Sequence, residues 1–258
     1  MRIDVLTLFP ELFTPIFASS ILGRAQKRGL VELHAIDIRD FAVDKHRTVD
    51  DTPYGGGPGM VLRVDVLVRA IEAVRDDDAR VVLLTPSGAL FKQARAREFA
   101  HWPHLVLVAA HYEGYDERVS AYVDLEISLG DFVLMGGEAA AWAVLESTVR
   151  LVPGVIQEES ARGESFEDVL LEAPQYTRPP VFRGQAVPEV LLSGDHGAVR
   201  QYRRKEALRR TARRRPDLLV GTHLSPEDRL WLAEIGQPGV PADEQQDGGG
   251  VGRERQDP

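Results

Sequence analysis

The first 155 or so residues alternate short β-rich runs with helical patterns, and this alternation constrains the fold more than any other feature. We predict strands at residues 2–9, 31–38, 80–85, 104–110 and 124–129. Helical patterns separate them at residues 10–27, 64–74, 91–100 and 137–151. Strands that alternate with helices form a largely parallel sheet covered on both faces. The sequence therefore predicts an α/β fold.

A glycine-rich segment, residues 46–60, interrupts this alternation with four glycines and two prolines. Glycine costs backbone entropy and proline removes a hydrogen-bond donor, so neither a helix nor a central strand is expected there. A long irregular segment in a compact domain is usually functional or disordered. Tyr54 and Met60 argue against disorder. The segment is then either a bulky surface turn or a loop whose backbone approaches a flat or anionic ligand.

Three predicted strands end in small or glycine-containing segments: residues 85–88, 112–114 and 129–138. Ligands of open parallel sheets bind beyond the carboxyl ends of the strands. One such segment alone is an ordinary β–α turn, but three neighbouring ones favour a ligand site. Leu129, Val133 and Leu134 are suited to line a slot of adenine size, with main-chain groups reading its edge.

Motifs that the sequence lacks argue against several common functions. No G-x-G-x-x-G follows the first strand and no G-x-x-x-x-G-K-[ST] occurs, which disfavours dinucleotide dehydrogenases and phosphate-loop ATPases. The absence of cysteine excludes disulfides and thiolate metal sites. The histidines show no paired helical spacing, so a transition-metal site is not expected. Without a signal-peptide pattern or a long apolar run, we expect a cytoplasmic protein with no membrane span.

The net charge of −9 conceals a basic block near the C-terminal end. Residues 200–215 hold nine basic residues and one acidic residue, Glu206. Such a block either contacts phosphates or forms a solvated helix face, and its density favours phosphates. We predict that residues 153–180 form a linker or mobile loop and that residues 181–234 are mostly helical. Residues 236–258 have the composition of a disordered tail.

With these residues in view, the chain resembles the bacterial tRNA (guanine-N1)-methyltransferase family, TrmD, of the SPOUT superfamily. The matching segments run in order from the first predicted strand to the basic block. They are residues 8–11, 40–41, 46–60, 112–114, 116–119, 130–131, 133–134, 136–138, 153–155, 176–179 and 188–196.

The resemblance implies a SPOUT-type, mostly parallel sheet with a deep trefoil knot in the C-terminal half of its domain. On this pattern residues 1–160 form the methyltransferase domain, residues 161–178 an interdomain lid, and residues 179–235 a small helical tRNA-binding domain. Residues 236–258 form the tail. The resemblance also implies an obligate homodimer in which both chains build each active site, with the tRNA anticodon stem-loop as partner.

The same resemblance implies that S-adenosyl-L-methionine binds in the knot and methylates N1 of the guanine just 3′ of the anticodon, position 37. The cofactor residues that it implies are Thr85, Pro86, Gly88, Ala110, Tyr112, Glu113, Gly114, Leu129, Gly130, Asp131, Phe132, Val133, Leu134, Gly136 and Gly137. Three positions depart from the common family pattern: Ala110 where glycine is common, Met135 where a small residue is common, and Ala140 where proline is frequent.

The chemistry requires a base and a cation, because N1 of neutral guanine carries a proton and negative charge develops on O6. Arg150 matches the active-site arginine of the family. The family's general base is an aspartate in the pattern Asp-Ser-Phe, and here Glu164 stands at that position. We predict Glu164 as the base, with Asp168 as the alternative. The alternative function is that of a catalytically silent RNA-binding relative, which has lost its base through this change.

The glycine-rich segment then becomes a candidate platform for the flipped guanine. We predict that Arg47 and Asp50 read base edges, whereas His46 is structural. The other platform residues are Tyr54, Gly55, Gly56, Gly57, Pro58 and Gly59. The phosphate contacts along the anticodon stem are assigned to Arg203, Arg209, Arg210, Arg213 and Arg214, and such contacts position RNA rather than specify its sequence. The family depends on magnesium, but the sequence shows no metal cage, so we assign no metal ligands and expect any Mg²⁺ to keep several waters.

Overall fold

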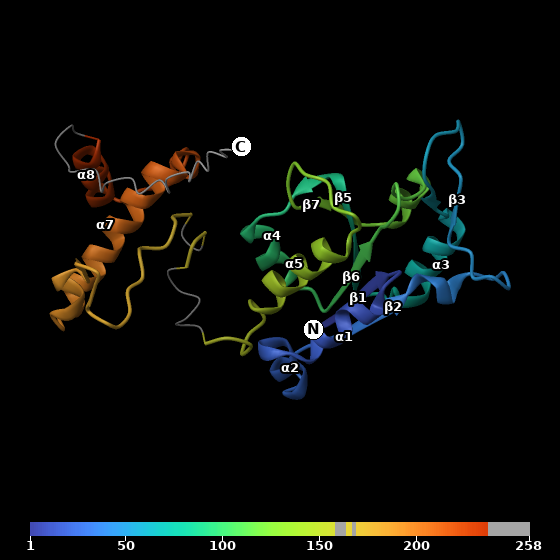
Figure 1. Cartoon of the computed structure of the whole chain (residues 1–258), viewed down its shortest axis with the longest axis horizontal. Coiled ribbons are helices and arrows are strands. Elements are labelled where there is room, and N and C mark those ends of the chain that lie inside the picture. Colours follow the sequence, from blue (N-terminus) through green and yellow to red (C-terminus); the bar gives the residue numbers. More distant parts are fainter. Residues whose placement is uncertain (158–163, 167–168, 237–258) are drawn as a thin grey trace, which may run out of the picture. The chain divides into compact units, whose positions relative to one another are not determined.

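Five parallel strands form the central sheet, in the spatial order β2-β1-β6-β5-β7 (Figure 1). Their bounds are β1 (Arg2–Thr7), β2 (Glu32–Asp37), β5 (Ala79–Leu90), β6 (His104–Ala109) and β7 (Leu125–Ser128). Each of the five predicted strands corresponds to one of them. The predicted α/β fold with a mostly parallel sheet is therefore confirmed.

This computed structural model describes residues 1–157, 164–166 and 169–236. The chain divides into two units, Met1–Arg162 and Gly163–Pro258. Around the sheet, the first unit contains the helices α1 (Phe13–Ala18), α2 (Ser20–Lys27), α3 (Val64–Val74), α4 (Gln93–Phe99) and α5 (Glu138–Val149). It also contains three 3-10 helices, η1 (Pro10–Leu12), η2 (Ile38–Phe41) and η3 (Glu117–Tyr122), and the short strands β3 (Asp50–Asp51) and β4 (Val61–Leu62).

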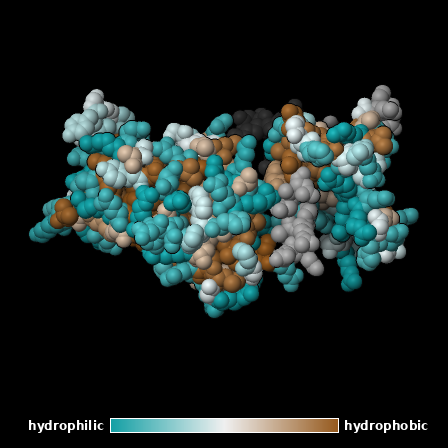
Figure 2. Space-filling view, turned by 180° about the vertical axis from the view of Figure 1, so that it is seen from behind, coloured by the Kyte–Doolittle hydropathy of each residue, from teal (hydrophilic) through white to brown (hydrophobic). Residues whose placement is uncertain are grey.

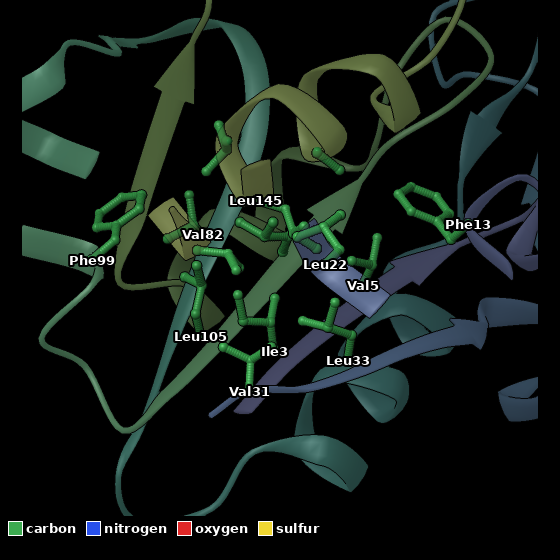
Figure 3. Packing of buried hydrophobic residues seen from close by; sticks show 14 of the residues in the cluster. Ile3, Val5, Phe13, Leu22, Val31, Leu33, Val82, Phe99, Leu105 and Leu145 are labelled. Carbon is green, nitrogen blue, oxygen red and sulfur yellow. The ribbon is translucent and has the colours of Figure 1, made fainter. Parts of the chain in front are cut away.

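The inner strand β6 is buried on both faces of the sheet, which explains why it is a nearly continuous apolar run. Along β6, Leu105 and Leu107 belong to one core cluster, whereas Val106 and Val108 belong to the other. This division follows from side chains that alternate across a strand. The first cluster joins the sheet to α1, α2, α4 and α5 (Figure 3). The second joins the opposite face to α3.

The prediction of a single helix over residues 10–27 is wrong, because the chain breaks at Ser19 and Ser20. Ser19 is extended, with φ −95° and ψ 156°, and Ser20 has a φ of 46°. The Ser19 hydroxyl donates to the carbonyl of Ile16 at 2.9 Å, and such local bonds compete with helix continuation. Helix α2 then returns against α1 so closely that a Cβ on Gly23 would lie 2.3 Å from the carbonyl oxygen of Ala18.

Strand β5 is longer than the predicted strand at residues 80–85 and contains an insertion. Leu84 and Ala89 both pair with Ile127 of β7, so residues 85–88 are left out of the ladder. Gly88 allows the chain to return to β7, because a Cβ there would lie 2.3 Å from the backbone nitrogen of Ile127. Such an irregularity re-aims side chains where a strand ends. It places residues 85–88 at the carboxyl edge of the sheet.

The second unit is built on helix α7 (His196–Arg214). Asp195 caps this helix, since its Oδ1 accepts from the backbone nitrogen of Gly197 at 2.8 Å. In the last turn of the helix, the buried Thr211 accepts from the backbone nitrogen of Leu171 at 2.9 Å. This hydrogen bond holds the segment that begins at residue 169 against helix α7.

Helix α8 (Pro226–Ile235) packs on α7 through an ion pair with two hydrogen bonds. Arg204 Nε and Nη2 donate to the two carboxylate oxygens of Asp228 at 3.0 and 2.9 Å. Hydrogen bonding to Arg204 lowers the pKa of Asp228 to about 2. The unit also contains the hairpin of β8 (Val181–Phe182) and β9 (Gln185–Ala186) and the 3-10 helices η4 (Glu189–Leu192) and η5 (Pro216–Leu219).

The surface seen in Figure 2 is mainly hydrophilic, with smaller hydrophobic patches between the polar residues. Among the described residues, no helix has both the length and the apolar character needed to cross a bilayer.

Candidate functional site

A cavity of about 350 Å³ lies at the carboxyl ends of β5, β6 and β7. This is the edge at which parallel sheets bind their ligands, and the volume is within the range of small-molecule sites. Every predicted cofactor residue lines it except Gly88 and Asp131. Gly88 instead supports the inserted segment of β5 behind the cavity wall. The structure thus brings three separate predicted segments into one site.

The cavity also has lining residues that were not among the predicted cofactor residues. They are Leu84, Ser87, His111, Tyr115, Glu117, Ile127, Ser128, Met135 and Ala140. Most of them adjoin a predicted residue at the end of a strand. Their closeness along the sequence to the predicted strand ends is the signal by which they could have been predicted.

One wall of the cavity, residues 110–114, pairs with the end of the glycine-rich segment. The Glu113 backbone nitrogen donates to the Met60 carbonyl, and the Leu62 nitrogen donates to the Gly114 carbonyl, both at 3.0 Å. At Gly59, a Cβ would lie 2.2 Å from Cγ of Glu113. The glycine therefore lets the Glu113 side chain pack against the loop, and the glycine-rich segment borders the cavity.

The opposite wall, residues 129–137, passes close to the end of β6. The Gly137 backbone nitrogen donates to the Ala110 carbonyl at 2.6 Å. A Cβ on Gly137 would lie 2.8 Å from Cα of Ala109, and one on Gly136 would lie 2.2 Å from Nδ1 of His111. Gly137 is required by this close approach to backbone atoms, whereas a side chain at Gly136 would displace the side chains of His111 and Glu138.

A polar network lies beside these glycines at the start of α5. Thr7 Oγ1 donates to Oε1 of Glu138 at 3.0 Å, and His111 Nδ1 lies 3.3 Å from its Oε2. Thr7 is buried and only 11% of the Glu138 side chain is exposed. Glu138 thereby connects β1, the segment after β6 and α5. A carboxylate in the first turn of a helix is also stabilised by the helix dipole.

The glycine-rich segment forms a hairpin arm held by the pairing of β3 with β4. The Tyr54 side chain at its far end is completely exposed. The four glycines at positions 55, 56, 57 and 59 have φ values from 80° to 128°, which side chains of L residues rarely allow. Arg47 is exposed, with 50% of its side chain accessible, and it pairs with Asp40 and lies 3.7 Å from Asp37. Asp50 lies in β3 and is partly buried.

The predicted acid–base residues do not belong to the same unit. Arg150 ends α5 in the first unit, where a cation is favoured by the helix dipole. Glu164 belongs to the second unit and is partly buried. Asp168 lies outside the described residues. Across the described part of the chain, no cluster of three or more His, Asp or Glu side chains is arranged to hold a metal.

The predicted phosphate-binding arginines of α7 differ in their contacts. Arg209 pairs with Glu206, and Arg210 donates to the Glu172 carbonyl at 3.2 Å. Arg203, Arg213 and Arg214 are exposed, and none of them forms an ion pair with another described residue. These three guanidinium groups are thus the ones most accessible to a polyanion.

The fold and the cavity define an α/β protein with a ligand site at the carboxyl edge of a parallel sheet. A family profile described as "tRNA (Guanine-1)-methyltransferase TrmD" matches residues 1–221. The chain belongs to this family.

Relatives that carry the name tRNA (guanine-N(1)-)-methyltransferase match nearly the whole chain. The relative from Chloroflexus aggregans is 54% identical over 248 residues, covering 93% of this chain and 97% of its own length. Those from Dictyoglomus turgidum and Deinococcus radiodurans are 50% and 52% identical over 236 and 240 residues. They cover 91% and 92% of this chain, and 96% and 86% of their own lengths.

Proposed function

We propose that this chain transfers a methyl group from S-adenosyl-L-methionine to N1 of the guanine at position 37 of tRNA. The relatives' names supply the reaction on tRNA guanine N1. The observation that carries the proposal is the cavity at the ends of β5, β6 and β7, which collects almost all residues assigned to the cofactor.

The chemistry of the cavity fits this cofactor. Leu129, Val133 and Leu134 offer apolar contacts to an adenine, and the carboxylates of Glu113 and Glu117 line the same space. Carboxylates favour the positive charges of a sulfonium and an ammonium group. A Cβ on Gly136 or Gly137 would lie less than 3.0 Å from neighbouring atoms, so this part of the cavity wall consists of backbone. When bound, S-adenosyl-L-methionine supplies the electrophilic methyl group.

The residues of the chain then have to prepare the guanine. Glu164 removes the proton from N1, and Arg150 stabilises the negative charge that develops on O6. Asp168 is the alternative base. Because guanine is stacked inside the anticodon loop, it must leave the stack to reach the cavity. The hairpin arm, through Arg47, Asp50 and residues 54–59, is proposed to hold it there.

We extend the proposal to the architecture and assembly. The tight crossing of residues 129–137 past the end of β6 supports a deep trefoil knot in this domain. Large exposed apolar side chains support a homodimer interface, since such patches mark contact surfaces. They are Leu90, Phe132, Val133, Leu134, Met135 and Trp142. Residues 161–178 serve as the lid between the domains, and residues 179–235 as the helical tRNA-binding domain. A tRNA substrate is consistent with a cytoplasmic site of action.

The predicted arginines of α7 contact phosphates along the anticodon stem, and the exposed Arg203, Arg213 and Arg214 are the strongest candidates. Magnesium dependence is proposed from the family resemblance alone. A Mg²⁺ ion would keep several of its water ligands.

The test is transfer of a labelled methyl group to tRNA with G37, in parallel with the same tRNA carrying A37. We expect incorporation into the first and none into the second. The departure at Glu164 keeps one other candidate function open, a silent RNA-binding relative. Binding of tRNA without any incorporation would establish that alternative and overturn the enzymatic proposal.

A further inference from the structure

The second unit has a cavity of its own, with a volume of about 420 Å³. It is lined by residues 174–178, Pro180, Val187, Leu191, Leu192 and Arg203 of α7. The first three residues of the Tyr-Thr-Arg-Pro motif at residues 176–179 are part of this lining. That motif carries part of the family resemblance, and the function proposed above assigns its side chains no contact with the cofactor or the tRNA.

The lining combines apolar, aromatic and cationic side chains. Pro174, Pro180, Val187 and Leu191 give it apolar surface. Tyr176 is 47% exposed, and burial raises the pKa of its neighbour Tyr202 to about 12. Two arginines, Arg178 and Arg203, also line the cavity. No Asp or Glu is among the described residues that line it.

A basic stripe continues from this cavity along α7. Positions 200, 203, 210 and 214 share one face of the helix, because they are spaced by three, four or seven residues. Arg210 contacts the Glu172 carbonyl, so this face is the one next to the segment that leads to Tyr176. Arg200, Arg203 and Arg214 are exposed and form no ion pair with other described residues. A polyanion following the stripe would reach the cavity.

We propose that this cavity binds one unstacked nucleotide of the tRNA, distinct from the guanine that is methylated. Its base packs on the Tyr176 ring and the apolar surface, while Arg178 and Arg203 bind the adjoining phosphates. Stacking on an aromatic ring tolerates any base, so the cavity holds the tRNA without reading its sequence. The proposal rests on the proposed function for the identity of the RNA. The cationic lining without carboxylates favours RNA over a protein segment as the occupant.

The first experiment compares Tyr176→Ala with Tyr176→Phe in the full-length protein, using tRNA methylation as the readout. Loss of the ring should raise the KM for tRNA at least about fivefold and leave kcat within about twofold, because stacking contributes to binding only. Tyr176→Phe retains the ring and should match the wild type. Equal KM values for tRNA in both variants would overturn the proposal that the cavity binds a nucleotide. Methylation of tRNA by the wild type would still support the proposed function in that case.

Salt dependence tests the two arginines. Arg178→Ala and Arg203→Ala should each reduce the slope of log K against log salt for tRNA binding by about 0.7 to 0.9, the value for one phosphate contact. Arg229→Ala removes an exposed arginine from α8, away from the cavity, and should leave the slope unchanged. Unchanged slopes for both cavity variants would contradict the phosphate contacts.

Ultraviolet crosslinking of wild-type protein to tRNA, with mapping of the modified peptide, makes the test independent of how the variants fold and of catalysis. A crosslink at Tyr176 supports the proposal even where the wild type fails to methylate, and in that case only the proposed function falls. Crosslinks confined to other residues overturn the proposal. A changed oligomeric state in Tyr176→Ala with an unchanged KM for tRNA assigns the cavity to a second copy of the chain and also overturns it.

Discussion

Replacing Gly137 by alanine tests whether the close crossing behind the first cavity is required for cofactor binding. The new Cβ would lie 2.8 Å from Cα of Ala109 and 2.9 Å from the backbone nitrogen of Ala110. Carbon atoms pack at about 3.5–4.0 Å, so the segment must move by about 1 Å. That movement stretches the 2.6 Å bond from the Gly137 nitrogen to the Ala110 carbonyl beyond hydrogen-bonding distance.

The expected cost follows from these two effects. Overpacking costs about 1–3 kcal/mol and a lost hydrogen bond about 0.5–1.5 kcal/mol, which together give about 1.5–4.5 kcal/mol. For a chain of this size the melting temperature should fall by roughly 3–18 °C. Because the displaced segment is a cavity wall, we also expect about tenfold or greater loss of affinity for S-adenosyl-L-methionine.

Gly236→Ala is the matched control for this change. Gly137 has φ −77° and ψ −4°, and Gly236 has φ −76° and ψ −9°, so alanine loses the same backbone freedom at both. At Gly236 the nearest atom to the new Cβ would be 3.7 Å away. Calorimetric titration and thermal unfolding measure both variants. If Gly137→Ala retained the wild-type affinity and melted within about 2 °C of the control, the steric argument would be refuted.

Three further predictions concern the base, the basic helix and the α7–α8 contact. Glu164→Gln should abolish methyl transfer but leave the calorimetric affinity for S-adenosyl-L-methionine unchanged, and unchanged turnover would exclude Glu164 as the base. Charge reversal of both Arg213 and Arg214 should weaken tRNA binding and lower its salt dependence, as measured by titration at several salt concentrations. A slope of log K against log salt equal to that of the wild type would show that the two arginines lie on a solvated helix face and contact no phosphates. Asp228→Asn should destabilise the protein by about 2 kcal/mol near neutral pH, because the contact with Arg204 holds the carboxyl pKa at about 2, below its unfolded value of 3.8. Since the folded pKa is depressed, this stability is present above about pH 4 and is lost as pH falls towards 2, so chemical denaturation of both proteins at pH 7 and pH 2.5 should show the difference shrinking.

The central sheet was predictable from sequence because its strands are buried on both faces. Runs such as Leu105–Val108 are apolar at every position, and each alternate residue enters a different core cluster. The break between α1 and α2 was not predictable from periodicity, since it depends on the local bond of one serine hydroxyl. The full length of β5 was also missed, because the strand resumes after an insertion that only pairing with β7 reveals.

The candidate site was predictable to the extent that it follows strand ends. The three segments around the cavity could be named because parallel strands end at the same edge of a sheet. The contacts of Glu138 were not predictable, because its partners Thr7 and His111 lie 131 and 27 residues away. Spacing along a sequence carries no signal for such contacts. The ion pair between Arg47 and Asp40 was likewise visible only in the structure.

The position of β1 in the sheet has a consequence for synthesis on the ribosome. This first strand is central, with β2 on one side and β6, about 100 residues later, on the other. At translation rates of roughly 5–20 residues per second, β6 emerges about 5–20 s after β1. During that time Ile3 and Val5, which are completely buried in the finished sheet, have no β6 beside them. A nascent chain of this protein is therefore expected to expose the apolar residues of β1 to chaperones until residue 109 has left the exit tunnel.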